Sequence, residues 1–296
     1  MNRPVSWLIL LFVIGGCFPH FASAQDAENG RVEDGTVQDY VEIELSDGSR
    51  FVGSVLSENE SQIQFRTVSG LEITLELSAV VSRRTIRARL AGGELVRLDP
   101  TSSRLFFGAT GRPLTKGGGY LAAYELFFSL AAYGVSDDVI VSGGITLFPF
   151  SPVQIYYIAP KVTVYNENDR SVALGVLAGG ITTGGGVGGI LYGVSTIGPP
   201  DRAVSAGAGF LFGGGEVKST PVILFGFERQ LSSKIKLISE NYAFPWDSSE
   251  ILFSGGVRFI GGRLTTDLAG FTILSSLDEG GIPFLPWLSF TYHFGN

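Results

Sequence analysis

The sequence predicts an all-β protein made of a small barrel followed by a larger up-and-down antiparallel barrel. Its 296 residues include 41 glycines, and glycine costs about 1 kcal/mol at a helical position relative to alanine, so a helix-rich globule is excluded. Only 17% of the residues are charged and 45% are hydrophobic, which excludes a disordered chain. Apolar and polar residues also alternate with the period of two that is typical of half-buried strands.

Residues 1–24 have the pattern of a secretory signal peptide. Arg3 precedes the apolar run Trp7–Ile14, and Ala22-Ser23-Ala24 forms a cleavage site. The apolar run is too short to span a bilayer. We therefore expect an exported protein that is cleaved after Ala24. The alternative is a lipoprotein site at Ile14-Gly15-Gly16-Cys17, which would retain Cys17 in acylated form.

Residues 25–38 are predicted to be a flexible leader, and residues 39–99 a small, periplasmic β-barrel domain. Val41, Ile43 and Leu45 alternate with polar residues, and Asp47-Gly48 and Ser69-Gly70 are hairpin turns. About five short strands are expected. Their order resembles the small barrels of the Sm-like and SH3-like type, which implies a domain that binds RNA, peptides or other proteins. Export and the net charge of −7 give no reason to expect nucleic acid.

Residues 100–296 are predicted to form a transmembrane β-barrel, because two kinds of chain break alternate along them. Polar breaks recur roughly every 30 residues, the length of a two-strand hairpin. They are Ser136–Asp138, Asn166–Arg170, Pro199–Arg202, Gln230–Lys234 and Gly261–Arg263. The other breaks are rich in Gly, Pro and aromatic residues: Gly111–Gly119, Pro149–Pro152, Thr182–Gly186, Gly213–Glu216, Pro245–Ser249 and Ser275–Pro286.

These breaks predict about 12 strands, with 10 as the alternative. The first strand is expected to begin near Arg104, and residues 120–135 are expected to form one strand. The uncharged stretch from Ser171 to Pro200 is split at Thr182–Gly186, since this Thr/Gly cluster suits a hairpin tip better than a membrane helix.

The carboxy-terminal segment Leu288–Phe294 alternates aromatic and polar residues and ends in phenylalanine. It resembles the last strand of bacterial outer-membrane β-barrels, although Gly295 and Asn296 follow the phenylalanine here. The resemblance implies a Gram-negative outer membrane, contact with its lipid, short turns in the periplasm, and recognition of Leu288–Phe294 by the barrel assembly machinery. Trp246 and Trp287 are expected to be interfacial aromatic anchors.

Charged residues on the inward faces of the predicted strands are the candidate functional residues. The first interpretation is a cross-strand ion-pair network that fills the lumen, and the second is a constriction that selects solutes by charge. The candidates are Lys161, Glu228, Lys236, Glu240, Arg258 and Asp267.

No cofactor, metal or catalytic site is predicted. Residues 184–189 match the pattern G-x-G-x-x-G but lack the strand–helix context of a dinucleotide site. His293 and Ser289 are four residues apart on one strand, roughly 13 Å, which is too far for a catalytic hydrogen bond.

The main functional hypothesis is therefore an outer-membrane barrel that is a narrow passive pore or a structural membrane protein, with a periplasmic interaction domain. The alternative is a membrane anchor for the small barrel, which would then bind a periplasmic protein or the cell wall. An outer-membrane acyl hydrolase ranks below both. The sequence specifies neither a solute nor a partner, nor the oligomeric state.

Overall fold

The computed structural model describes residues 37–91, 94–245, 250–273 and 285–295, and these ranges are almost entirely β-strand. The all-β prediction is therefore confirmed. Within the same ranges, the one helical element is a single turn at Leu77–Ala79, so no helix there has the length and hydrophobicity to cross a membrane. The predicted signal peptide, Cys17 and residues 25–36 of the predicted leader lie outside the described residues.

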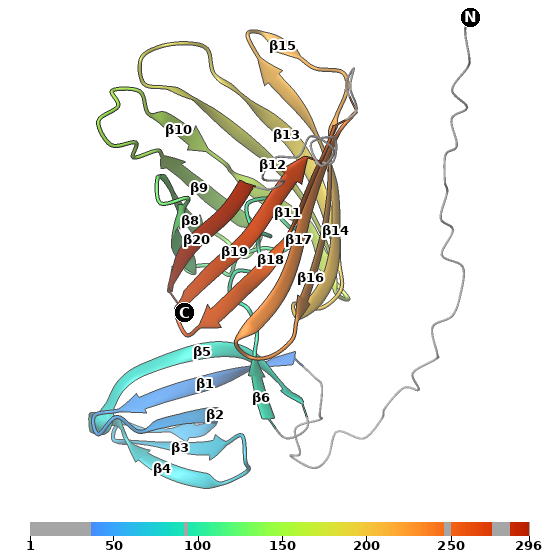
Figure 1. Cartoon of the computed structure of the whole chain (residues 1–296). Coiled ribbons are helices and arrows are strands. Elements are labelled where there is room, and N and C mark those ends of the chain that lie inside the picture. The colour runs from blue at the N-terminus through green and yellow to red at the C-terminus, as the bar shows by residue number, and fades with distance from the viewer. Residues whose placement is uncertain (1–36, 92–93, 246–249, 274–284, 296) are drawn as a thin grey trace, which may run out of the picture. The chain divides into compact units, whose positions relative to one another are not determined.

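The first six strands form an antiparallel sheet, the small sheet, in the order β4-β3-β2-β1-β5-β6 (Figure 1). Its strands are β1 (Val37–Leu45), β2 (Arg50–Glu58), β3 (Gln62–Thr67), β4 (Glu72–Glu76), β5 (Val80–Ala91) and β6 (Glu94–Arg97). The predicted small barrel is thus present with one strand more than expected.

The hairpin turns and the core of the small sheet follow the sequence pattern. Gly48 and Gly70 have φ of 85° and 87°, a left-handed conformation that glycine adopts without a Cβ clash. Ile43, Ile63 and Phe65 are completely buried and pack together. The apolar positions of the alternating pattern therefore supply the core.

The remaining strands close into an antiparallel ring of 12, which confirms the predicted number. In order around the ring they are β7 (Gly119–Tyr124), β8 (Phe128–Gly134), β9 (Val139–Ile145), an interrupted strand made of β10 (Ile155–Ile158) and β11 (Lys161–Glu167), β12 (Arg170–Ile181), β13 (Gly188–Ile197), β14 (Arg202–Gly213), β16 (Val222–Gln230), β17 (Ile235–Phe244), β18 (Glu250–Gly261), β19 (Leu264–Ile273) and β20 (Leu285–Phe294). β20 pairs with β7 and closes the ring, and the two-residue β15 (Glu216–Val217) pairs with β14.

Two predictions about the start of the barrel are wrong, and their errors cancel in the strand count. The chain near Arg104 is not a barrel strand, and the first one begins at Gly119. Residues 120–135 form two strands, because Glu125 and Leu126 turn the chain with φ of 48° and 64°. This turn carries no Gly, Asn or Pro, so the sequence does not reveal it. The Glu125 carboxylate accepts a hydrogen bond from the Leu288 amide at 2.6 Å, which helps to hold the turn in place.

The other breaks divide between the two ends of the barrel as predicted. All five polar breaks connect strands at one end, where Asn168 and Asp169 make a turn with φ of 51° and 57°. The Gly-rich and aromatic breaks lie at the other end, except Gly111–Gly119, which precedes the first barrel strand. Residues 246–249 and 274–284 of the last two breaks lie outside the described residues.

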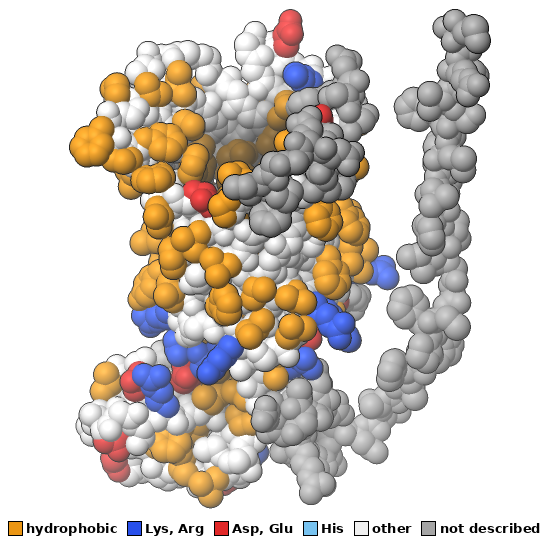
Figure 2. Space-filling model, viewed as in Figure 1, with side chains coloured by type: hydrophobic (Ala, Val, Ile, Leu, Met, Phe, Trp, Pro, Cys, Tyr) orange, Lys and Arg blue, Asp and Glu red, His pale blue; other side chains and the backbone are white. Residues whose placement is uncertain are grey.

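The outward face of the barrel is apolar, as the alternation predicts. Figure 2 shows hydrophobic side chains spread over the outer surface of the barrel strands. Leu174, Phe225, Phe253 and Leu268 are each about half exposed, and each alternates with an inward neighbour. A belt of exposed apolar side chains around a closed barrel is the pattern of a lipid-facing surface.

Glu42 gives the small sheet a testable pH dependence. Glu42 is 7% exposed, and its carboxylate contacts the guanidinium groups of Arg84 and Arg97. Burial alone would raise the pKa of Glu42, but the two arginines outweigh it and lower that pKa below the usual value. The ionised carboxylate therefore stabilises the folded sheet at neutral pH. This stabilisation is lost as the pH falls below about 4 towards the folded-state pKa.

We expect Glu42→Gln to lower the free energy of unfolding of the small sheet by about 2 kcal/mol at pH 7 and to flatten its decline in acid. Pulse proteolysis over a urea series measures this in the full chain. Glu44→Gln is the matched control, because Glu44 pairs with Arg50 at the solvent-exposed surface. Its effect on the free energy of unfolding should stay below about 1 kcal/mol. Equal effects of the two substitutions would contradict the account.

Candidate functional site: the barrel lumen

The chain between β6 and β7 fills part of the barrel interior. We call residues 98–112 the lumen segment. Thr101, Leu105 and Phe106 in it are completely buried. Leu105 lies against Gly226 of β16, where a Cβ would fall 2.2 Å from the leucine Cδ1, so the absence of a side chain makes room for the segment. The apolar side chains of the lumen segment therefore pack against the barrel wall as core residues do.

Asp99 of the lumen segment joins two cations of the wall. Lys236 of β17 and Arg258 of β18 are directly opposite each other in the strand register, and both are completely buried. Like charges in opposite positions destabilise a sheet. The Asp99 carboxylate lies 3.1 Å from Lys236 Nζ and 2.9 Å from Arg258 Nη1. One carboxylate thus neutralises part of the charge of both.

Arg258 also pairs with Asp267, the residue opposite it on β19, with Nε 2.6 Å from Oδ1. Its other guanidinium nitrogens donate to the carbonyls of Thr101 at 3.2 Å and Leu105 at 2.5 Å. Arg104 of the lumen segment completes this group, since it lies 3.3 Å from Asp267 and donates to Thr291 Oγ1 at 2.6 Å. The wall and the segment share one continuous ionic network.

A second part of the network forms around Glu228 of β16. Its carboxylate lies 2.6 Å from Lys236 Nζ and also contacts Arg112 of the lumen segment. Arg112 donates two further bonds to the carbonyls of Gly198 and Pro199, at 3.1 and 3.0 Å. Both ends of the lumen segment are therefore tied to the wall through charged side chains.

Lys161 and Glu240 hold the backbone of the lumen segment. Lys161 Nζ donates to the carbonyls of Ser103, Thr110 and Arg112 at 2.7–3.0 Å. Glu240 accepts the amides of Phe107 and Gly108 at 2.9 and 3.0 Å, and Tyr242 donates to it at 2.6 Å. Among the described residues neither has an ion-pair partner of opposite charge. Each instead replaces hydrogen bonds that the segment would otherwise make with water.

The structure places all six candidate lumen residues on inward faces, each at most 5% exposed. Lys236, Glu228, Arg258 and Asp267 form the predicted cross-strand pairs, whereas Lys161 and Glu240 bind the lumen segment. Sequence reasoning missed Asp99, Arg104 and Arg112, the three charges that the segment contributes. A signal was available, because residues 104–113 contain three consecutive apolar residues, two glycines and a proline, and lack the alternation of a barrel strand.

Trp287, expected as an interfacial anchor, instead faces inward. It shares a face with Ser289 and its ring lies 5.5 Å from the rings of Tyr124 and Phe271. Its position two residues before Ser289 sets this orientation, since side chains on a strand alternate between the two faces. Trp246 lies outside the described residues.

The residues considered for other chemistry have separate partners. His293 Nε2 lies 3.0 Å from Thr101 Oγ1, whereas Ser289 donates to Asp267 at 2.8 Å, so the two do not form a catalytic pair. Gly184 and Gly185 lie in the connection from β12 to β13 and do not precede a helix. No cluster of potential metal ligands occurs in the described ranges.

The lumen beyond the segment is hollow and mostly apolar. A cavity of about 1010 Å³ lies among the strand ends near the Gly-rich connections. Apolar and aromatic side chains dominate its lining, among them Phe128, Leu177, Leu211, Leu252 and Phe271. One half of the lumen is therefore polar and filled, and the other is apolar and open.

We expect Asp99→Asn to destabilise the closed barrel by about 3–5 kcal/mol, because Lys236 and Arg258 lose the anion between them. The temperature at which the folded band disappears on a denaturing gel measures this. The control is Asp138→Asn, in the exposed β8–β9 turn, which should change stability by less than about 0.5 kcal/mol. A transition temperature unchanged in Asp99→Asn would show that the ionic network does not hold the lumen segment.

No protein-family model and no curated protein matches this chain. Among solved structures it is similar to the KdgM porin in complex with disordered oligogalacturonate, with a TM-score of 0.46, 7% identity, and coverage of 60% of this chain and 98% of that chain. It is also similar to the outer membrane protein OmpT of Vibrio cholerae, with a TM-score of 0.32, 12% identity, and coverage of 89% and 99%. Pseudomonas aeruginosa OccK5 gives a TM-score of 0.32, 9% identity, and coverage of 90% and 100%. At TM-scores below 0.5 these likenesses do not bear on the function of this chain.

Proposed function

We propose that the protein is an integral β-barrel of the bacterial outer membrane that works as a narrow channel, closed at rest by the lumen segment. The closed ring of strands leaves no unpaired edge, and its apolar belt suits lipid. The short polar turns face the periplasm, and the small sheet lies on that side as an interaction domain. The predicted signal peptide supports export to this membrane.

The observation that carries the proposal is how the lumen segment is attached. Its backbone-to-backbone hydrogen bonds within the described residues run within residues 98–112 or to β5, and none joins the backbone of a barrel strand. Its polar contacts with the wall are made through charged and polar side chains, and Leu105 and Phe106 add apolar contacts with Ile238 and Phe271. The segment can therefore leave the lumen without breaking a backbone hydrogen bond between the strands of the wall, as a gate requires.

The filled lumen argues against a pore that stays open. The network around Asp99 is completely buried, so solutes have no polar route past it at rest. If the lumen segment never moves, the same geometry describes a purely structural barrel. Conductance distinguishes a gated channel from this alternative.

A disulfide between the lumen segment and the wall tests the gate. Thr101 and Thr265 are suited to it, because their hydroxyl oxygens are 3.0 Å apart in the lumen. In a Cys17→Ser background, we expect Thr101→Cys/Thr265→Cys to show opening events in planar bilayers when reduced and none when oxidised. Thr265→Cys alone is the control, and its conductance should be the same in the reduced and the oxidised protein. Identical conductance in both redox states would overturn the gate, and silence in both would make the barrel structural.

The partners stay predictions. Recognition of Leu288–Phe294 by the barrel assembly machinery and binding of a periplasmic protein by the small sheet are both compatible with the fold. In the anchor hypothesis the small sheet carries the function, and the lumen does not need to open.

A further inference from the structure

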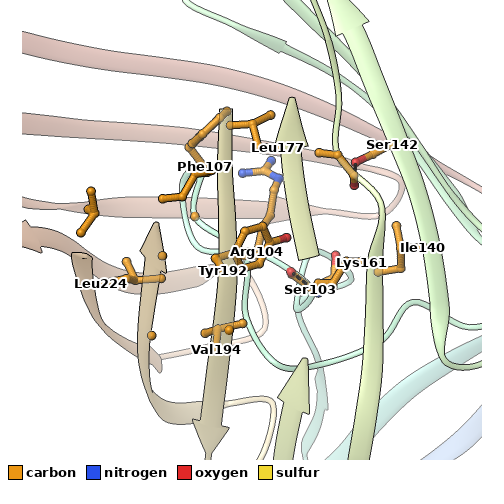
Figure 3. Close-up of a pocket in the computed structure, with 18 of the residues that line it drawn as sticks. Ser103, Arg104, Phe107, Ile140, Ser142, Lys161, Leu177, Tyr192, Val194 and Leu224 are labelled. Atoms are coloured by element: carbon orange, nitrogen blue, oxygen red, sulfur yellow. Dashed lines mark hydrogen bonds between the residues drawn. The ribbon is translucent and has the colours of Figure 1, made fainter. Parts of the chain in front are cut away.

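Two adjoining cavities occupy the lumen beyond the lumen segment. The smaller, of about 170 Å³, lies against Ser103 and Arg104, and the larger, of about 1010 Å³, continues to the Gly-rich end of the barrel. They share lining residues, including Phe107, Tyr124 and Leu177. Figure 3 shows Ser103, Arg104 and Lys161 among the apolar side chains around the smaller cavity. Together the two cavities form an apolar channel with a polar inner end.

Buried polar atoms at this inner end have no hydrogen-bond partner among the described residues. Tyr124 is 2% exposed, lines both cavities, and its hydroxyl is unpaired. Ser103 Oγ and Arg104 Nε at the smaller cavity and Trp287 Nε1 at the larger are also unpaired. A buried polar group without a partner costs about 1–3 kcal/mol. The donors of Tyr124, Ser103 and Arg104 all line the smaller cavity, and they therefore indicate a ligand that accepts hydrogen bonds.

The balance of buried charges in the lumen indicates the sign of the ligand's charge. Five buried cations and four buried carboxylates lie on the lumen segment and the inward faces of the described strands. They are Arg104, Arg112, Lys161, Lys236 and Arg258 against Asp99, Glu228, Glu240 and Asp267. Lys161, whose ammonium binds carbonyls, lines the smaller cavity together with Arg104. An excess cation in a medium of low polarity favours an anionic head group.

We propose that the two cavities bind one amphipathic carboxylate, an alkyl carboxylic acid in its ionised form. Its head accepts hydrogen bonds from the Tyr124 hydroxyl and from Ser103 and Arg104, and its alkyl chain lies in the larger cavity among Phe128, Leu177 and Leu211. The inference deepens the proposed channel function and rests on it, since it identifies the class of solute that reaches the lumen segment. The guanidinium of Arg104, 5.2 Å from the centre of the Tyr124 ring, places the two head-group donors together.

The experiment is equilibrium dialysis of radiolabelled decanoate against the full-length protein in lipid nanodiscs, with empty nanodiscs as background. We expect one saturable site. Tyr124→Phe removes only an unpaired hydroxyl, so the barrel should fold as before and the Kd should rise about tenfold. Decanol, which lacks the charge, should bind at least about tenfold more weakly than decanoate.

A matched pair of substitutions on β12 tests where the alkyl chain binds. Leu177→Trp should fill the shared part of the cavities and abolish saturable binding, whereas Leu174→Trp, on the outward face of the same strand, should leave binding unchanged. Heat-modifiable migration on a gel verifies folding of each variant. If Leu177→Trp does not fold, Tyr124→Phe and decanol still decide the head-group site.

No saturable site, an unchanged Kd in Tyr124→Phe, or equal binding of decanol would overturn the proposal. These outcomes are independent of the gate, because binding is measured without conduction. A protein that binds decanoate but is silent in bilayers in both redox states would keep the binding site and lose the channel function. A protein that opens and closes but binds no decanoate would keep the channel function and lose the binding site.

Discussion

The pairing of Lys236 with Arg258 across two neighbouring strands is the constraint on which the interior depends. Two buried cations face each other there, and the wall pairs each of them with a carboxylate of its own, Lys236 with Glu228 and Arg258 with Asp267. Asp99, from a segment that precedes the barrel in the chain, supplies the carboxylate that contacts both cations at once. Folding of the wall and entry of the lumen segment are therefore coupled, because each buries charges that the other neutralises.

The two halves of the lumen follow from this coupling. Where the lumen segment lies, the wall presents charges and hydroxyls, and nearly every one has a partner on the segment or on a neighbouring strand. Where the segment does not reach, the inward positions are apolar and leave a cavity of about 1010 Å³. Tyr124 and Arg104 lie at the boundary, and their unpaired polar atoms indicate a molecule that enters from the apolar side.

Much of the fold could be predicted from the sequence, because period-two alternation and turn residues act locally. The polar turns follow from local turn residues, and the inward position of Arg258 and Asp267 follows from parity along single strands. The strand number follows from the chain breaks, with two errors at the start of the barrel that cancel. The lumen segment could not be predicted in the same way, because Asp99 and Arg104 meet their partners more than 130 residues later in the chain. The turn at Glu125 could not be predicted for a different reason. Its residues do not favour a turn, and tertiary contacts, including that with Leu288, hold them in the turn conformation.

The central claim is that residues 98–112 are held inside the barrel by side chains of its wall. The exchange rates of the Phe107 and Gly108 backbone amides test it most directly, because both amides donate to the buried Glu240 carboxylate. They can be measured by nuclear magnetic resonance on the protein in nanodiscs. The account predicts protection comparable to that of the barrel strands. Exchange at the rate of an unstructured chain would contradict it.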